Sequence, residues 1–394
     1  MREFGPNPGR VHELAGLARE LDLLRARAAA GTLKPKVSLE DLTRLVRMPR
    51  STLHRYVTGQ TLVPSEVLDR IVIALGASPA EQRDWNEAWY RVHATPVQVP
   101  NALPATIRGF VGRTAELAGL DRSLASAEPG LPILAVSGPP GVGKTALAVH
   151  WAHRARSRFP DGCLYVDLRG YSPDPPLEPS EALGTVLGCL GDDGPADAAH
   201  YRSRLAGRRM LVVLDNALCA EQVRPLLPGS GSSAVIVTSR DDLAGLVARE
   251  GAHRISLDPL PQPEALALLG NLLGENLPAA TVLAHRCGGL PLALRVAAEA
   301  WDTSLADVSG LDWLDAGGDP RTGVRAVFSW SYRRLVPEAA ALFRLLGRHS
   351  GGDLTGLAGH RLVRTLERAH LVRTSSGRYR MHRLLRAYAA ELSD

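Results

Sequence analysis

Residues 133–152 read ILAVSGPPGVGKTALAVHWA, and this stretch decides the fold of the central part of the chain. An apolar run is followed by the pattern G-x-x-x-x-G-K-[ST] and then by helical spacing. Glycines let backbone N–H groups converge on phosphate oxygens, and a helix that begins there presents the positive end of its dipole to them. We therefore predict a phosphate-binding loop, whose cofactor contacts come from Gly138, Pro139, Gly141, Val142, Gly143, Lys144, Thr145 and Ala146.

Two residues of this loop have predicted roles of their own. Lys144 reaches the β- and γ-phosphates of a nucleotide, and the hydroxyl of Thr145 ligates Mg²⁺. The second metal ligand is Asp215 in RRMLVVLDNA (208–217), because it follows the apolar run Leu211–Leu214. Open α/β sheets bind ligands at this end of their strands. The sequence thus predicts a site for ADP or ATP with Mg²⁺, in which Thr145 and Asp215 hold the metal.

Two further strand ends complete the set of candidate catalytic residues. Many nucleotide hydrolases have a second acid directly after the strand Asp, but here the position holds Asn216, which cannot take a proton. This favours a slow switch over fast hydrolysis. AVIVTSR (234–240) ends in Arg240, a cation placed to sense a γ-phosphate, although an Arg after a strand is more often a surface residue. The candidate catalytic residues are Lys144, Asp215, Asn216 and Arg240.

Short apolar runs alternate with amphipathic stretches on both sides of the loop. The runs at 133–137, 163–168, 210–214 and 234–238 predict buried strands, and the stretches between them predict helices. Strand–helix alternation implies a parallel, doubly wound sheet. From about residue 260 onward strand patterns nearly vanish and helices dominate.

The N-terminal region has the pattern of a helix-turn-helix domain of the phage-repressor type. SLEDLTRLV (38–46) predicts a first helix capped by Ser38, and STLHRYVTG (51–59) predicts a second helix ended by Gly59. The residues at the start of such a second helix enter the major groove of DNA. The candidate DNA contacts are Arg50, Ser51, Thr52, His54 and Arg55, within the segment 38–59. The alternative is a small helical bundle used only for protein contacts.

Composition and charge limit the possible classes of protein. A chain of 394 residues suggests two to four domains, and 45% hydrophobic residues suit cored domains. The N-terminus has no apolar core of a signal peptide, no apolar run reaches the length of a membrane span, and the four cysteines form no CxxC pair. We expect a cytoplasmic protein without a membrane partner. Residues 1–100 carry a net charge of +3, residues 101–324 carry −6 and residues 325–394 carry +8, which indicates a modular chain.

Three short motifs, taken with the phosphate loop and in this order, resemble the NB-ARC class of STAND signal-transduction ATPases. They are FVGRTAEL (110–117), CGGLPLAL (287–294) and RMHRLL (380–385). The resemblance implies that Val111, Gly112 and Arg113 hold adenine and ribose, and that Pro291 packs on the base. It also implies that His382 contacts the β-phosphate of ADP and keeps the protein closed. The family has Asp where this chain has Arg383, which predicts a weaker closed state.

The predicted fold is multidomain, combining α and α/β parts. We expect an XRE-like helix-turn-helix domain at 1–95, a linker at 96–108, a P-loop nucleotide-binding domain at 109–257, a helical domain at 258–318 and a winged-helix domain at 319–394. The basic winged-helix domain is expected to act as a lid over the nucleotide, the alternative being a second contact with DNA.

The combination of these domains is similar to actinobacterial transcriptional regulators of the SARP type. Those proteins often carry a C-terminal repeat array, and this sequence shows none, so we expect the signal to come from another protein or the chain to be truncated. The leading hypothesis is a transcriptional regulator that is an autoinhibited monomer with ADP and an oligomer with ATP. The alternatives are an ATPase, at most a slow one, and a defence or scaffold switch whose helix-turn-helix is an adaptor.

Overall fold

The computed structural model describes residues 6–11, 14–32, 34–94, 100–126, 130–274, 277–300, 310–315, 317, 322–348, 360–375 and 378–392. The chain divides into two compact units, Met1–Gln98 and Val99–Asp394. Residues 95–99, which include the end of the predicted domain 1–95 and the start of the predicted linker 96–108, lie outside the described residues.

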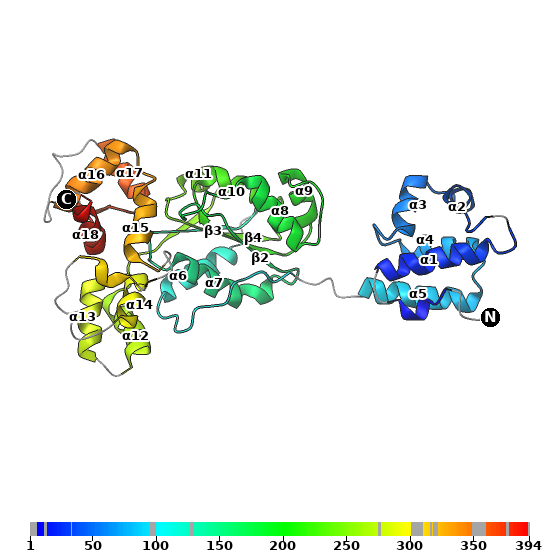
Figure 1. The fold of residues 1–394 in the computed structure, drawn as a ribbon, viewed down its shortest axis with the longest axis horizontal. Coiled ribbons are helices and arrows are strands. Elements are labelled where there is room, and N and C mark those ends of the chain that lie inside the picture. Colours follow the sequence, from blue (N-terminus) through cyan, green and yellow to red (C-terminus); the bar gives the residue numbers. More distant parts are fainter. Residues whose placement is uncertain are drawn as a thin grey trace. The chain divides into compact units, whose positions relative to one another are not determined.

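The first unit is a bundle of helices, as the sequence predicted (Figure 1). A short 3-10 turn, η1 (Pro8–Arg10), precedes α1 (Leu14–Ala28), α2 (Leu39–Val46), α3 (Arg50–Val57), α4 (Ser65–Ala74) and α5 (Pro79–Ala94). Apolar residues at helical spacing meet in one core, whose fully buried members include Leu17, Leu42, Leu53, Ile71 and Trp85. The helices α2 and α3 form the predicted helix-turn-helix.

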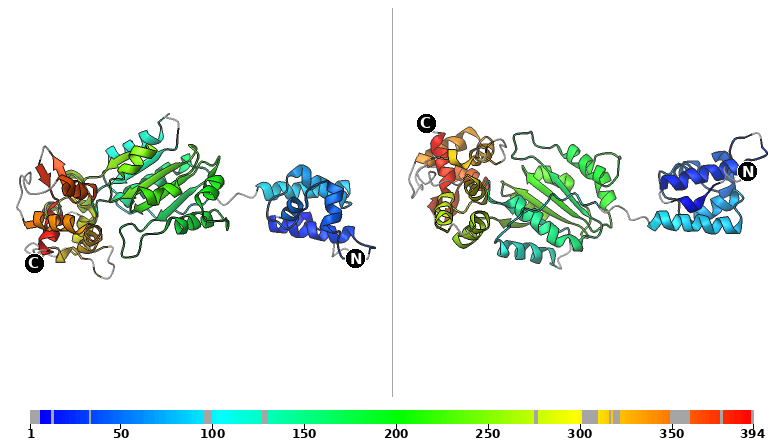
Figure 2. Two further views of the ribbon diagram at one scale, coloured as in Figure 1. Left: turned by 90° about the horizontal axis from the view of Figure 1, so that it is seen from above. Right: turned by 60° about the horizontal axis from the view of Figure 1, so that its bottom comes forward.

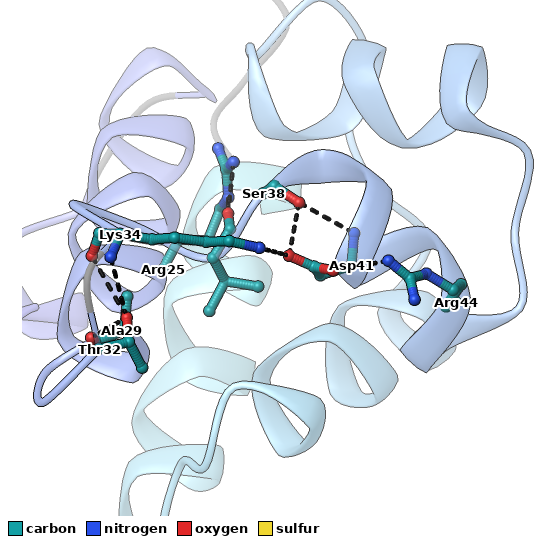
Figure 3. A network of polar contacts seen from close by, with 8 residues as sticks. Arg25, Ala29, Thr32, Lys34, Ser38, Asp41 and Arg44 are labelled. Atoms are coloured by element: carbon teal, nitrogen blue, oxygen red, sulfur yellow. Dashed lines mark hydrogen bonds and ion pairs between the residues drawn. The ribbon is translucent and has the colours of Figure 1, made fainter.

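The turn before α2 is fixed by a cluster of polar contacts (Figure 3). Ser38 caps the helix, since its Oγ accepts a hydrogen bond from the Asp41 N–H at 3.1 Å and donates one to the Asp41 carboxylate at 2.7 Å. Lys34 Nζ and Arg44 Nη2 donate to the same carboxylate at 2.7 and 2.8 Å. Hydrogen bonds from Lys34 and Ser38 lower the pKa of Asp41 to about 2. The start of α2 is therefore held by ion pairs as well as by its cap.

The second unit begins with a five-stranded parallel sheet in the order β2-β3-β4-β1-β5. Its strands are β1 (Ile133–Ser137), β2 (Cys163–Asp167), β3 (Leu211–Ala217), β4 (Ala234–Ser239) and β5 (His253–Ser256). The first four coincide closely with the predicted apolar runs. Sequence analysis missed β5, because only Ile255 of its four residues is buried and no apolar run marks it.

Helices cover both faces of this sheet (Figure 2). Leu134 and Val136 of β1 pack toward α6 (Thr114–Leu124) and α7 (Lys144–Ala155), while Ile133 and Ala135 pack toward the opposite face. That face is covered by α8 (Pro179–Cys189), α9 (Ala198–Leu205), α10 (Ala220–Val223) and α11 (Ala244–Glu250), with the 3-10 turn η3 (Arg224–Leu226) after α10. A second 3-10 turn, η2 (Arg156–Arg158), continues α7 on the first face. Burial on both faces explains the continuous apolar runs.

Helices follow the sheet in two groups (Figure 1). The first consists of α12 (Gln262–Leu273), α13 (Leu277–Cys287) and α14 (Pro291–Glu299). The second contains η5 (Asp312–Leu314), α15 (Val324–Tyr332), α16 (Pro337–Arg348), α17 (His360–Arg368), the antiparallel hairpin β6 (Arg373–Ser375) and β7 (Arg378–Arg380), and α18 (Arg383–Glu391). Helices with a short hairpin agree with the predicted helical and winged-helix parts. None of the helices in the described ranges is long and apolar enough to span a membrane.

Candidate nucleotide-binding site

The predicted phosphate loop lies between β1 and α7, at the carboxyl edge of the sheet. Gly141 and Gly143 have φ values of +77° and +94°, in the left-handed region that favours glycine. The loop also contacts α14 of the first helical group, because the Leu292 N–H donates to Gly141 O at 3.1 Å. The segment thus has the backbone form of a phosphate-binding loop and is tied to the helices that follow the sheet.

Lys144 is the first residue of α7, and its ammonium group is buried inside the loop. Its Nζ donates hydrogen bonds to the carbonyl oxygens of Gly138 at 2.8 Å and Pro139 at 2.9 Å. Burial, with the nearby positive charge of Arg240, lowers the pKa of Lys144 well below its usual value. An anion at this place would stabilise the charged form of the lysine.

Asp215 is buried at the carboxyl end of β3, where three hydroxyl groups hold it. Thr238 donates to its carboxylate at 2.5 Å, Thr145 at 2.8 Å and Tyr165 at 3.0 Å. Burial nevertheless raises the pKa of Asp215. The predicted metal ligands Thr145 and Asp215 therefore lie in direct contact.

Asn216 lines the site, but its amide is engaged elsewhere. Its backbone is in the left-handed region with φ of +57°, and its N–H donates to Thr238 Oγ1 at 2.9 Å. The side-chain Nδ2 donates to Ser172 Oγ at 3.2 Å and weakly to Tyr171 O at 3.4 Å. Asn216 thus ties the end of β3 to the segment that follows β2.

Arg240 extends from the end of β4 to α15. Its Nη1 donates to Val327 O at 2.6 Å and to Ser331 Oγ at 3.0 Å. The guanidinium lies over the ring of Tyr171 at 5.2 Å and over that of Trp330 at 5.6 Å. Burial lowers the pKa of Arg240 to about 10. The predicted phosphate sensor is therefore bound to the winged-helix part in this structure.

The residues predicted to hold the base lie at the start of α6. Arg113 is 5% exposed, and its Nη2 donates to Val142 O of the phosphate loop at 3.0 Å. Gly112 has φ of +68°, in the left-handed region that favours glycine. Phe110 stacks on His150 of α7, with ring centroids 4.2 Å apart. The Arg113 contact brings the start of α6 against the phosphate loop, and the Phe110 contact packs residue 110 on α7.

One cavity of about 510 Å³ joins these parts. Its lining includes the charged residues Lys144 and Asp215 and the apolar residues Ile107, Val111, Leu268 and Pro291. The predicted residues that line it are Val111, Arg113, Gly141, Val142, Gly143, Lys144, Thr145, Ala146, Asp215, Asn216, Arg240 and Pro291. The predicted residues Gly112, Gly138, Pro139 and His382 are not among its lining. Lining residues that sequence analysis missed include Tyr165, Asp167, Tyr171, Ser172, Thr238, Arg295 and Trp330.

His382 lies at the N-terminus of α18, against the turn between α13 and α14. Its Nδ1 accepts a hydrogen bond from the Leu384 N–H at 3.3 Å, so Nε2 carries the proton and donates to Gly288 O at 3.0 Å. Burial lowers the pKa of His382, which favours this neutral ring. Arg383 at the next position contacts the ring of His285 with its Nη1, 3.1 Å from Nδ1. His382 thus connects α18 to the turn that precedes Pro291.

The α3 helix of the first unit presents the predicted DNA contacts. Arg50, Ser51, His54 and Arg55 are exposed and Thr52 is half-buried, while Leu53 and Val57 are buried in the core. The guanidinium of Arg55 donates to Thr61 Oγ1 at 2.9 Å. The helix therefore offers one basic, polar face to solvent, as a recognition helix does.

Comparisons with known proteins agree with both units. Residues 17–85 match a helix-turn-helix domain family. Regulatory protein AfsR of Streptomyces coelicolor is 41% identical in a match that covers 76% of this chain and 34% of that protein. Disease resistance-like protein DSC1 of Arabidopsis thaliana is 28% identical, over 74% of this chain and 26% of that protein.

A solved structure of a STAND protein with a tetratricopeptide repeat sensor, from Pyrococcus horikoshii, is 18% identical over 76% of this chain and 45% of its own, with a TM-score of 0.39. The chain spans about a third of the length of the AfsR protein it matches. The present chain combines an N-terminal helix-turn-helix domain with an NB-ARC or STAND ATPase region homologous to AfsR regulators and plant disease-resistance proteins.

Proposed function

We propose that this chain, an AfsR-like regulatory protein with a helix-turn-helix and a STAND ATPase region, is a transcriptional regulator switched by ADP and ATP. ADP would hold the second unit closed, and exchange for ATP would open it and allow oligomers to form. Helix-turn-helix domains brought together in this way gain avidity for repeated half-sites. We place this activity in the cytoplasm.

The observation that carries the proposal is the composition of the cavity wall. The α/β core contributes Lys144 and Asp215, α14 contributes Pro291, and α15 contributes Val327 and Trp330. Three parts of the unit thus line one site for a nucleotide. A ligand that contacts these parts differently in its diphosphate and triphosphate forms can shift their arrangement, because a ligand shifts an equilibrium by its difference in affinity for the two states.

The residues fit a nucleotide with Mg²⁺. Burial lowers the pKa of Lys144 and that of Arg240 while it raises that of Asp215, so the site contains charged groups that lack solvation. Phosphate groups would compensate the two cations, and a divalent cation would compensate the carboxylate. Lys144 would bind phosphate oxygens, and Thr145 and Asp215 would hold the metal, which supplies charge neutralisation at the phosphates.

The contacts of Arg240 and His382 suggest how the closed state is held. Arg240 binds α15 by two hydrogen bonds, and His382 binds the turn before Pro291. A γ-phosphate near Arg240 would compete with Val327 and Ser331 for its guanidinium. We propose that this competition releases α15, and that the hydrogen bond between His382 and Gly288 O opposes the release.

DNA is the proposed partner of α3, through Arg50, Ser51, Thr52, His54 and Arg55. Their exposure on one polar face supports contact with phosphates and base edges. The alternative is that this face binds a protein and serves as an adaptor. The dependence of binding on salt concentration distinguishes the two partners. Affinity for DNA falls steeply as salt is added, because each phosphate that the protein neutralises releases a counterion.

The test compares DNA binding and oligomeric state of the full chain with ADP and with ATP. Lys144→Ala should abolish the nucleotide response by removing the phosphate contact, and Arg55→Ala should weaken DNA binding without changing nucleotide binding. Arg249→Ala, which removes an exposed charge from α11, is the matched control. Equal DNA affinity and equal oligomeric state of the unaltered chain and Lys144→Ala in both nucleotides would refute the switch.

A further inference from the structure

Asp167 is a second carboxylate in the lining of the cavity, together with Asp215. It is the last residue of β2, and it is paired in register with Asp215 on the neighbouring parallel strand β3. Paired residues on adjacent parallel strands point to the same side of a sheet, and the strands lie about 4.8 Å apart. Asp167 and Asp215 are the two acidic residues among those that line the cavity.

The backbone around Asp167 is fixed to the end of β3. The Leu168 N–H donates to Asp215 O at 2.8 Å, and the Gly170 N–H donates to Asn216 O at 2.7 Å. A Cβ on Gly170 would lie 2.4 Å from Leu218 N, so the segment is closely packed. The position of Asp167 relative to Asp215 is therefore set by the sheet rather than by a free loop.

The two carboxylates differ in how fully they are engaged. Asp215 accepts hydrogen bonds from three hydroxyl groups. Within the described part of the chain, the hydrogen bond found for the side chain of Asp167 is one from the Arg169 N–H to Oδ1, at 2.9 Å. Asp167 is half-buried rather than enclosed, so its second oxygen can accept a proton or a hydrogen bond from water.

Asn216, which follows Asp215, is unsuited to take a proton from a water molecule for two reasons. An amide takes no proton, and this amide is bound to the segment after β2 through Ser172. At the position after the strand Asp, where many nucleotide hydrolases have an acid that acts as a base, this chain has Asn216. This asparagine instead holds the segment that follows Asp167.

We propose that Asp167 is the catalytic residue that orients and deprotonates the attacking water when the site hydrolyses ATP. The water oxygen forms a bond to the γ-phosphorus, the bond from that phosphorus to the β,γ-bridging oxygen breaks, and ADP leaves with the electron pair. The carboxylate of Asp167 takes the proton from the water, and ADP and inorganic phosphate are the products. This inference rests on the proposed function, because it assigns a resetting step to the same nucleotide site.

The experiment measures single-turnover hydrolysis of MgATP by the full chain together with the dissociation constant for MgATP, using a fluorescent ATP analogue. Asp167→Asn keeps an oxygen for the Arg169 N–H but cannot take the proton. General-base catalysis contributes about 10²–10⁴-fold. We therefore expect at least about 100-fold slower hydrolysis with a dissociation constant within about threefold. Asp167→Glu should recover part of the rate, and Asp193→Asn, which removes an exposed charge from the same unit, should change neither quantity.

Several results would overturn the inference. If Asp167→Asn hydrolyses ATP at an unchanged rate, Asp167 is not the base. If it mainly weakens MgATP binding, and does so only when Mg²⁺ is present, Asp167 is a metal ligand instead. If the unaltered chain binds MgATP but never hydrolyses it, the switch stands without this step. Failure of the unaltered chain to bind ADP or ATP would refute the proposed function itself.

Discussion

Arg240 connects the nucleotide site to α15 through a single side chain. It is 8% exposed, and its partners are a backbone carbonyl, a buried hydroxyl and two aromatic rings. Only a guanidinium has donors and a flat face for all of these contacts at once. Its replacement removes two buried hydrogen bonds from a charged donor, each of which contributes about 1.5–3 kcal/mol.

Arg240→Ala should therefore release α15 in the presence of ADP. We expect thermolysin to cleave within 324–332 at least about fivefold faster than in the unaltered chain. Arg240→Lys keeps the charge but loses the fork and the stacking, and should give an intermediate rate. Equal cleavage rates in all three proteins would show that α15 is held by its apolar contacts alone.

The residues of the site differ in how far the sequence could predict them. Lys144, Thr145 and Asp215 follow from a spaced motif and from the end of an apolar run, because both patterns have a direct physical cause. Asp167 ends an equally apolar run, and Trp330 belongs to an amphipathic helix, so neither stands out locally. Their place in the cavity depends on strand order and on the packing of α15, which no short stretch of sequence determines.

Among the helices, α2 shows how a local signal fixes an element. Its cap was predicted from Ser38, and the structure places Ser38 Oγ 3.1 Å from the Asp41 N–H. Capping residues satisfy one of the free N–H groups in the first turn, and replacing them with Ala costs about 1 kcal/mol. The strand β5 is the opposite case, since its existence depends on pairing with β1 rather than on its own four residues.

Ser38→Ala should destabilise α2 and with it the presentation of α3. We expect amide hydrogen exchange in residues 39–46 of the full chain to accelerate about fivefold, the equivalent of about 1 kcal/mol. Ser65→Ala is the matched control, because Ser65 begins α4 and the preceding cap position, Pro64, has no side-chain hydrogen bond. An effect of the same size from both substitutions would mean that the cap itself contributes nothing.

Charge is distributed across the second unit in a way that favours the lid interpretation of its basic C-terminal part. The region 101–324 carries −6 and the region 325–394 carries +8. In the structure Arg368 lies 3.5 Å from Asp241 and 3.7 Å from Asp242, and Arg373 is paired with Asp258. Exposed pairs of this kind contribute little each. Together they orient the basic part toward the acidic core.

His370, which lies between Arg368 and Arg373 in the sequence, makes the stability of the folded chain sensitive to pH. It has φ of +52°, and its Nε2 is buried without a hydrogen-bond partner within the described residues. Burial, with the positive charge of Lys144, lowers its pKa to about 4, and Asp242 opposes the shift. The pKa of His370 in the folded chain lies below its ordinary value of 6.5. Its contribution to the free energy of unfolding is therefore complete above pH 6.5 and is lost as the pH falls toward 4.

We expect the free energy of unfolding of the ADP-bound chain to fall by on the order of 1 kcal/mol between pH 6.5 and 5.5. In this range His370 binds a proton in the unfolded chain but stays neutral in the folded chain. His370→Asn should lack this loss, since Asn does not titrate and tolerates a positive φ. Burial raises the pKa of Asp241, so its protonation acts in the opposite direction, but it is present in both proteins and cancels in their difference. The measurement is the thermal midpoint of each protein with saturating ADP. If the thermal midpoints of the two proteins change in parallel with pH, protonation of His370 does not destabilise the folded chain.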